Sequence, residues 1–292
     1  MRVSFVILHY LAPEMTMRCI GLLRQNFAAE GVQLVVVDNA SPDGSGPALM
    51  ERCRDMADVH FVLLHGNKGF AQGNNAGYRY AVEHFDPDFI VVMNNDVLIE
   101  DPSFIDRIYS EYAEDPFAVL GPDIWAPEAG RHQSPTKLLP MTEEKARELR
   151  RIFRLKDRFY AYQHYSWKLK QMLGLARTKQ PEDNEPDKPH TDCVLHGACY
   201  IFSRDFISRR RDAFNPATFL YMEEDILHLE CRRDSLRMRY CPSLKVTHLE
   251  DVSTNAAFKS GYRRNKVKYK RMVDSLDIFI ALMQGQTDTR DE

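Results

Sequence analysis

The sequence predicts an α/β protein in which a mostly parallel central sheet has helices on both faces. Two observations support this fold class. Apolar runs without polar alternation, such as residues 89–93, are typical of strands that are buried on both faces. In the first part of the chain these runs alternate with segments whose apolar residues have helical spacing, which is the order of elements in a parallel sheet with crossover helices. The 292 residues allow a sizeable core.

The elements follow in order from the N-terminus. Residues 3–8 form an apolar strand, and the segment 13–27 repeats apolar residues at helical spacing. The second strand, 34–37, ends in a cluster of turn-forming residues at 38–44. Further strands are predicted at 61–64, 89–93 and 118–121, and further helices end near residue 56, span 71–84 and span 102–114.

The regular alternation breaks after residue 121. Residues 142–175 form a predicted helical segment in which basic side chains mix with aromatic ones. The acidic, proline-rich segment 179–190 is expected to be an extended, mobile loop. Strand character returns at 193–202. A helix from residue 223 to about 233, short strands at 239–241 and 245–248, and a basic segment at 256–272 complete the prediction.

The stretch from residue 66 to residue 100 is the strongest candidate for a ligand site. A turn rich in glycine and asparagine leads into a helix, and glycine lets the backbone approach a ligand closely. The next strand ends in Asn94, Asn95 and Asp96, and ligands of α/β proteins bind where strands end. Such a triplet is also a common turn sequence, but the turn beside it favours a metal or phosphate site at Asp96. This turn contains Gly66, Asn67, Gly69, Gly73, Asn74, Asn75 and Gly77.

Composition and motifs exclude several functions. A net charge of −3 gives no electrostatic argument for nucleic-acid binding. The first strand is followed by HYLAPEM, which lacks the glycine pattern of dinucleotide-binding folds and of P-loops. Six cysteines without a C-x-x-C pair predict reduced thiols in a cytosolic protein and no zinc site. The apolar N-terminus has no small-residue cleavage site, and no run of about 18 apolar residues predicts a membrane span.

Three adjacent carboxylates, Glu223, Glu224 and Asp225, open a predicted helix directly after an aromatic run. Acidic residues in a first helical turn often do no more than complement the helix dipole. Crowding of carboxylates, however, also raises the pKa of one of them, which makes a competent general base. The residues alone leave both interpretations open.

Five motifs occur in one order along residues 1–250: VVVDNASPDGS, GNKGFAQGNNAGYRYA, VVMNNDV, FLYMEEDILHLECRR and LKVTHLEDVS. In this order they resemble the family 2 glycosyltransferases of the GT-A fold, particularly the bacterial rhamnosyltransferase-like and capsular polysaccharide branch. The resemblance implies a Rossmann-like sheet with added helical segments. It also implies transfer of a sugar, with inversion, from a nucleotide-sugar donor with the help of a divalent metal. The segment 125–190 and the tail after 255 contain none of these five motifs and are not placed by the resemblance.

On the donor side, the resemblance implies that Asp38 binds the nucleobase, in a pocket lined by the backbone near His9 and Tyr10. Asp96 matches the last position of the family's DxD-type motif and would hold the metal together with His248. The first position of that motif is an asparagine here, which leaves fewer charges on the metal. Carboxylate and diphosphate oxygens suit Mg²⁺ or Mn²⁺, and a histidine ligand favours Mn²⁺. The remaining donor-site residues would be Asn67, Gly69, Asn74, Asn75 and Asn95.

On the acceptor side, the resemblance implies that Glu224 is the base that takes the proton from the acceptor hydroxyl. The family has aspartate at this position, and the longer glutamate leaves Glu223 and Asp225 as alternatives. Direct displacement at an anomeric carbon needs this base on one side and charge stabilisation of the departing diphosphate on the other. The acceptor would be faced by His196, Gly197 and Tyr200.

The predicted organisation is a glycosyltransferase domain at 1–255 and a basic amphipathic helical tail at 256–292. Within the domain, 1–122 would bind the nucleotide sugar and 191–255 the acceptor, while 125–190 would be a helical insertion with a mobile acidic loop. The predicted reaction moves a sugar from a UDP- or dTDP-sugar to a saccharide or lipid-linked acceptor in cell-surface polysaccharide synthesis.

Two alternatives stay open, a nucleotidyltransferase that makes sugar nucleotides and a catalytically idle nucleotide-sugar-binding subunit of a polysaccharide assembly complex. The predicted location is the cytoplasm, and the two basic segments would allow peripheral binding to an anionic membrane surface at the inner face of the cell membrane. No nucleic-acid partner is predicted, and oligomerisation is left open.

Overall fold

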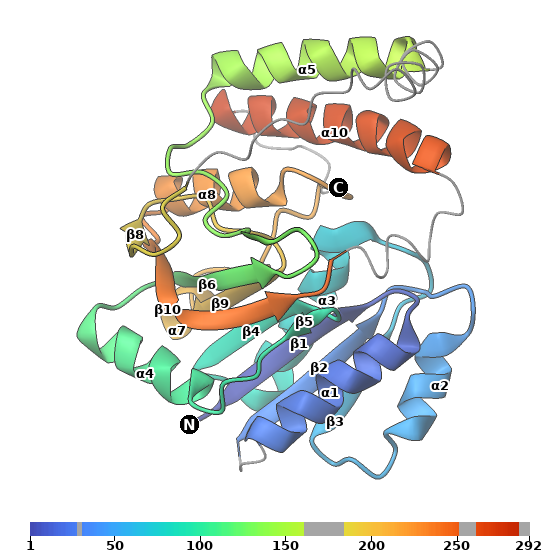
Figure 1. The fold of residues 1–292 in the computed structure, drawn as a ribbon, viewed down its shortest axis with the longest axis vertical. Coiled ribbons are helices and arrows are strands. Elements are labelled where there is room, and N and C mark those ends of the chain that lie inside the picture. Colours follow the sequence, from blue (N-terminus) through green and yellow to red (C-terminus); the bar gives the residue numbers. More distant parts are fainter. Residues whose placement is uncertain (28–30, 161–183, 251–260, 286–292) are drawn as a thin grey trace.

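The computed structural model describes residues 1–27, 31–160, 184–250 and 261–285, and a mixed sheet runs through the centre of this part of the chain (Figure 1). The order of its strands is β3-β2-β1-β4-β9-β6-β10-β5, with β7 paired to β6 and β8 paired to β10. The strands are β1 (Val3–His9), β2 (Val32–Asp38), β3 (Val59–Leu63), β4 (Phe89–Asn94), β5 (Val97–Leu98), β6 (Val119–Ala126), β7 (Arg131–His132), β8 (His190–Thr191), β9 (Cys199–Ser203) and β10 (Met238–His248).

The directions of the strands confirm the predicted fold class. β3, β2, β1 and β4 are parallel neighbours, and β6 and β10 are parallel to each other. β9 lies between β4 and β6 and is antiparallel to both. The carboxyl ends of β1, β2 and β4 therefore meet at one edge of the sheet, where ligands of such folds bind.

Helices cover both faces of the sheet (Figure 1). Alternate residues of a strand point to opposite faces. Phe5 of β1 packs in the core that α1 and α4 cover, whereas Val6 packs in the core that α3 and α8 cover. The helices are α1 (Pro13–Phe27), α2 (Ser45–Arg52), α3 (Gly69–Phe85), α4 (Phe104–Glu114), α5 (Glu143–Arg158), α7 (Arg204–Ile207), α8 (Glu223–Arg233) and α10 (Gly261–Met283).

A third layer of helices lies on the side of α8 that faces away from the sheet. α10 lies against α8, and α5 lies on α10 (Figure 1). Their contact is a separate apolar cluster that includes Ile226 of α8, Ala146 of α5 and Phe279 of α10. The predicted helical segment 142–175 is thus a helix as far as residue 158, and residues 161–175 lie outside the described part. The same holds for 256–260 of the predicted basic helix.

Three predicted elements differ from the structure. The two predicted closing strands are one strand, β10, with a register shift between Cys241 and Lys245, where Pro242 has no amide hydrogen to donate to the sheet. Residues 193–198 are not a regular strand: their apolar side chains pack into the core, and Val194 forms an isolated bridge with Lys137. Most of the predicted glycine-rich turn belongs to α3, which begins at Gly69.

All six cysteines are buried and free. None of the helices found in the described residues has the length and apolar character needed to cross a bilayer.

Candidate active site

A buried carboxylate and a histidine meet where β4 and β10 end. Asp96 lies in the turn between β4 and β5, and His248 is the last residue of β10, which pairs with β5. Nε2 of His248 lies 3.2 Å from Oδ1 of Asp96, a buried oxygen that accepts no hydrogen bond from any described residue. Nδ1 of His248 lies 2.7 Å from Oε1 of Gln133, whose amide nitrogen donates to Glu250. A neutral His248 therefore carries its proton on Nδ1, and the lone pair of Nε2 faces the carboxylate.

A second imidazole lies against this pair. The ring centroid of His196 is 5.9 Å from that of His248. Desolvation, together with the charges of His248 and Arg131, lowers the pKa of His196 to about 3, so this ring is neutral at physiological pH. Its Nδ1 accepts a hydrogen bond of 3.2 Å from the backbone of Ala198. His196 therefore adds a polar, uncharged wall to the site.

The three carboxylates at the start of α8 have three different environments. Both oxygens of the buried Asp225 lie 2.6 Å from Nζ of Lys137. Burial and the charge of Glu224 raise the pKa of Glu223 to about 8, so Glu223 is mostly protonated at neutral pH. Glu224 is only half-buried, and its Oε1 accepts a hydrogen bond of 3.3 Å from the backbone nitrogen of Gly197. Burial and the charge of Asp225 also raise the pKa of Glu224.

His196 and Gly197 connect the pair of Asp96 and His248 to the start of α8. His196 stands beside His248, and the next residue, Gly197, donates to Glu224. A Cβ atom at Gly197 would lie 3.0 Å from Oε1 of Glu224, so a side chain here would push the glutamate from its position. One short segment thus fixes the spacing between the two ends of the site.

On the opposite side of Asp96, a chain of buried polar groups connects the loops that follow β4, β1 and β2. Nδ2 of Asn95 donates to Oγ1 of Thr16 over 2.9 Å, and this hydroxyl lies 2.7 Å from Nδ1 of His9. Nε2 of His9 lies 2.9 Å from Oγ of Ser45, which donates to Asp43 over 2.6 Å. His9 is fully buried, and desolvation lowers its pKa. Its neutral ring therefore donates from Nε2 to Ser45 and accepts at Nδ1 from Thr16.

Asp38 and its neighbour Asn39 shape the loop after β2. Oδ1 of Asp38 accepts from the backbone of Ser41 over 3.1 Å, and its other oxygen lies where a Cβ of Gly46 would be. Asn39 binds the start of α3, because its Oδ1 accepts from the backbone of Lys68 and its Nδ2 donates to the carbonyl of Gly69. Asp38 is 4% exposed, so only a small part of its surface is open to a ligand.

The start of α3 is held by its own polar groups. Oδ1 of Asn67 accepts from the backbone nitrogen of Gly69 over 2.9 Å. Gly69 has a φ of +79°, and a Cβ there would lie 2.0 Å from the carbonyl oxygen of Phe219. A glycine is needed at this position because the loop that contains Phe219 and leads into α8, here called the acidic-motif loop, crosses directly over it.

The structure places three of the predicted site residues in the interior. Asn74 and Asn75 are fully buried in α3. Nδ2 of Asn74 donates to the carbonyl of Phe70, and the amide of Asn75 binds the backbone of Phe214 through both of its polar atoms. Tyr200 is fully buried in β9, and its hydroxyl donates to the carbonyl of Leu195. These three side chains support the site from behind and have no surface for donor or acceptor. Gly73 and Gly77 also serve packing, since Cβ atoms there would collide with β1 and β2.

The pattern of the family described as Glycosyl transferase family 2 matches residues 4–174, more than half of the chain. The chain belongs to this family. Over 231 residues it is also 23% identical to the low-salt glycan biosynthesis hexosyltransferase Agl10 of Haloferax volcanii, an alignment that covers 79% of this chain. The chain spans less than two thirds of that relative, 63% of its length.

Solved glycosyltransferases share the fold. The mannosyltransferase PcManGT of Pyrobaculum calidifontis, solved with GDP-Man and Mn²⁺, matches with a TM-score of 0.53 and 13% identity, over 96% of this chain and 70% of its own. TarS of S. aureus, residues 1–349 with UDP-GlcNAc, matches with a TM-score of 0.54 and 13% identity, over 94% of this chain and 66% of its own. The fold is therefore the GT-A fold of this glycosyltransferase family, as the resemblance implied.

The residues at the end of β4 fit the divalent metal that glycosyltransferases of this fold can bind. Neighbouring ligands of an octahedral ion with bonds of about 2.1 Å lie about 3 Å apart, which matches the separation of Asp96 and His248. Gln133 fixes the ring of His248 as an outer partner of a metal ligand does. No cluster of three or more His, Cys, Asp or Glu in the described ranges could hold a metal. Asp96 and His248 would therefore bind it together with oxygens of the substrate.

Sequence reasoning did not find the partners that orient these residues. Gln133, Lys137, Thr16 and Ser45 were not predicted, although each contacts a candidate site residue. Only the turn-forming character of 38–44 gave a local signal, and it indicated a loop without naming Ser45 as a partner of His9.

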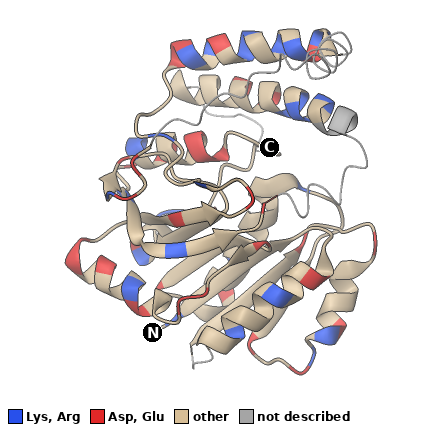
Figure 2. Ribbon diagram, viewed as in Figure 1, with Lys and Arg blue, Asp and Glu red and all other residues tan. Residues whose placement is uncertain are grey.

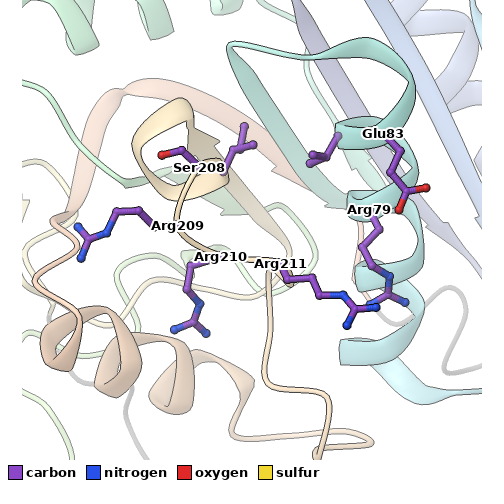
Figure 3. Close-up of a pocket in the computed structure, with 8 residues that line it drawn as sticks. Arg79, Glu83, Ser208, Arg209, Arg210 and Arg211 are labelled. Carbon is purple, nitrogen blue, oxygen red and sulfur yellow. The ribbon is translucent and has the colours of Figure 1, made fainter.

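A separate cavity of about 320 Å³ lies between α3 and the segment after α7 (Figure 3). Arg79, Arg209, Arg210 and Arg211 line it, and in Figure 3 Arg209 and Arg210 point away from Arg79 and Arg211. Arg79 pairs with Asp212, and Arg210 pairs with both Glu230 and Asp234. Two of the four arginines thus hold α3, the segment after α7 and α8 together through ion pairs, and the lining residues include none of the candidate site residues.

Proposed function

We propose that this protein is an inverting glycosyltransferase, which moves a sugar from a UDP- or dTDP-sugar to a saccharide or lipid-linked acceptor in cell-surface polysaccharide synthesis. The observation that carries the proposal is the segment of His196 and Gly197, which connects the base candidate Glu224 to the pair of Asp96 and His248. A base and a site for the leaving group thus lie on two sides of one segment, as direct displacement requires.

In the proposed reaction, Glu224 takes the proton of the acceptor hydroxyl while the acceptor oxygen forms a bond to the anomeric carbon. The bond between that carbon and the diphosphate oxygen breaks, and the nucleoside diphosphate leaves with its electron pair. When bound, the metal supplies positive charge to the diphosphate. Asp96 and His248 would hold it, while Asp38 and the backbone near His9 and Tyr10 would bind the base of the nucleotide. One-step displacement from the opposite side inverts the anomeric configuration.

Glu224 is supported as the base by the environments of its neighbours. Asp225 is held in an ion pair with Lys137. Glu223 is buried, and its raised pKa keeps it mostly protonated. Glu224 is exposed enough to meet an acceptor, and Gly197 aims its carboxylate. The raised pKa of Glu224 also makes it a better proton acceptor than an ordinary glutamate.

The donor is tested by measuring nucleotide release from UDP-, dTDP- and GDP-sugars, with and without Mn²⁺. GDP-sugars belong in the screen because the relative PcManGT was solved with GDP-Man, whereas TarS was solved with UDP-GlcNAc. We expect metal-dependent release from one donor, and its loss in Asp96→Ala. Equal release by the variant and the unaltered protein would contradict the metal role of Asp96.

The same screen separates the two alternatives. A nucleotidyltransferase would consume a nucleoside triphosphate and a sugar phosphate and release pyrophosphate. The tight turn after β1, at Tyr10 to Ala12, contains no glycine and no basic residue, which disfavours a triphosphate cradle. An idle binding subunit would bind a donor without turning it over, even when acceptors are supplied.

We also propose that the free end of the α5–α10 pair contacts an anionic membrane surface. Lys and Arg gather where α5 ends and α10 begins (Figure 2). Arg151, Arg158 and Lys266 are exposed there, beside Leu155 and Phe159, whose exposed fractions are 55% and 51%. Basic residues around exposed apolar side chains suit the interface of a bilayer with anionic lipids. A surface of this kind would bring the site to a lipid-linked acceptor.

Sedimentation with vesicles tests this membrane contact. The protein is expected to sediment with phosphatidylglycerol vesicles at low salt and to stay in the supernatant with phosphatidylcholine vesicles. The double variant Arg151→Glu/Phe159→Asp should lose most of the binding, whereas Lys145→Glu, at the other end of α5, should keep it. Failure of the unaltered protein to bind anionic vesicles would remove the proposal without affecting the transferase site.

A further inference from the structure

One face of α10 contacts the loop that leads into the acidic motif. Lys268, Arg271 and Ser275 share this face because they are three and four positions apart. Nζ of Lys268 lies 5.5 Å from the ring centroid of Tyr221, and Cζ of Arg271 lies 4.0 Å from that of Phe219. Oγ of Ser275 donates to the carbonyl of the residue between them, Leu220, over 3.1 Å. Each of the three loop residues thus has one partner on α10.

Two consecutive residues of this loop have strained backbone conformations. Tyr221 and Met222 have φ values of +76° and +69°, although neither is a glycine. Such conformations are costly and persist where surrounding contacts enforce them, often in ligand sites. The loop is also tied to α3, because the amide of Phe70 donates to the carbonyl of Phe219 over 2.8 Å. The catalytic candidate Glu224 follows two residues after Met222, so the loop joins α10, α3 and the base.

The two cations on this face differ from the paired arginines of α5. Arg147 pairs with Glu143, and both Arg150 and Arg154 pair with Asp277. Arg271 and Lys268 have no carboxylate partner in the ranges that the structure describes, and Arg271 is half-buried. When a guanidinium stacks on an aromatic ring, only its face is covered. Its N–H groups lie in the guanidinium plane and can still bind an anion.

From these contacts we infer that Arg271, assisted by Lys268, binds a phosphate group of a substrate beside the base loop. A phosphate fits because its oxygens match the guanidinium fork with two parallel hydrogen bonds, and because neither positive charge pairs with a carboxylate of the described residues. The inference rests on the proposed function and adds a substrate feature to it. Two substrates could supply this phosphate: the diphosphate of the nucleotide donor, or the phosphate that links an acceptor to its lipid.

The test compares ligand binding by calorimetry in the full chain and three variants. Arg271→Met keeps the stacking bulk but removes the charge, and Arg271→Lys keeps the charge but removes the fork. Lys270→Met is the matched control, because Lys270 is the exposed neighbour of Arg271 on α10. The probes are the nucleoside diphosphate of the donor that the release screen identifies, its nucleoside alone, and farnesyl diphosphate added to the nucleotide-saturated protein.

A donor phosphate predicts that Arg271→Met weakens nucleoside diphosphate binding by about tenfold or more, the range of a charge-assisted hydrogen bond, while nucleoside binding is unchanged. An acceptor phosphate predicts the same loss for farnesyl diphosphate only. Arg271→Lys should give an intermediate loss and Lys270→Met none in either case, and thermal unfolding verifies that the variants are folded. Unchanged affinity for both diphosphates in folded Arg271→Met would overturn the inference and leave the proposed function standing. Absence of any diphosphate binding by the unaltered protein would overturn both.

Discussion

The donor and acceptor sides of this site are built in different ways. On the donor side, the polar groups around His9 are buried and paired, since His9 is fully buried and both of its ring nitrogens have partners. On the acceptor side, Oε1 of the buried Glu223 has no hydrogen bond from the described residues. The loops around His9 thus form a fixed frame, and the acceptor side holds an unpaired carboxyl oxygen next to the proposed base.

This difference has a chemical reason. A nucleotide presents a rigid set of polar atoms, and prearranged loops bind it without further ordering cost. A general base, in contrast, must keep a pKa high enough to accept a proton, and burial beside other carboxylates supplies that shift at the cost of stability. Function should therefore be lost mainly through changes on the acceptor side, and folding free energy mainly through changes in the frame.

The largest expected effect is on the acceptor side. Glu224→Gln keeps the size of the side chain and its contact with Gly197 but cannot accept the proton. The rate of transfer should fall about 10²–10⁴-fold, the usual contribution of a positioned base, with nucleotide binding unchanged. Turnover measured with saturating donor and acceptor, beside calorimetry with the nucleotide, checks both parts. Retention of full activity would assign the base to another group.

The next effect concerns the metal pair between the two sides. Gln133→Leu removes the acceptor that holds Nδ1 of His248 and leaves both proposed ligands in place. The affinity for Mn²⁺ should fall about 10–100-fold, as it does when an outer partner of a metal ligand is lost. The Mn²⁺ concentration at half-maximal donor hydrolysis measures this change. If the value stays the same, His248 is not a ligand or does not depend on Gln133.

The sequence predicted the parts of this molecule that short segments determine. Strands buried on both faces are apolar along their whole length, so β1, β2 and β4 could be located from composition. The polar residues at the end of β4 indicated a ligand site at Asp96, and the acidic triplet indicated the start of α8. β10 was predicted as two short strands because a local pattern does not show that the strand continues beyond its register shift. The apolar run at 193–198 was assigned to a strand because burial alone does not distinguish a strand from a packed loop.

The side-chain contacts within the site could not be predicted from the sequence for another reason. Gln133 and His248 are 115 positions apart, and Lys137 and Asp225 are 88 apart. Such pairs depend on how the layers stack, and no spacing in the sequence encodes them. For the same reason Tyr200, Asn74 and Asn75 were placed in the ligand site from their neighbours in sequence, whereas their side chains point into the core. The contact of α10 with the acidic-motif loop likewise joins segments about 50 positions apart, as Ser275 and Leu220 are 55 apart.

Within the frame, the expected effect is on stability. Thr16→Val is close to isosteric, but it removes the hydroxyl that bonds Nδ1 of His9 and accepts from Asn95. Loss of partners for a buried polar atom should lower the free energy of unfolding by about 1–3 kcal/mol. Urea denaturation measures it, with Thr191→Val as the control because Thr191 is exposed. Equal stability of the Thr16 variant and the unaltered protein would mean that the chain of hydrogen bonds through His9 does not stabilise the frame.

The last effect tests whether the acceptor side destabilises the fold. Glu223 has a pKa of about 8 in the folded protein, above its ordinary value of 4.5, because of burial and the charge of Glu224. Between these two pH values the unfolded chain has lost the proton that the folded protein still holds, so unfolding becomes easier as the pH rises. Glu223→Gln cannot ionise and should therefore gain stability relative to the unaltered protein between pH 5 and pH 8, by up to about 3 kcal/mol for a shift of this size. Urea denaturation of both proteins at the two pH values measures this gain, and the same stability difference at pH 5 and at pH 8 would show that Glu223 ionises freely and that the acceptor side carries no such cost.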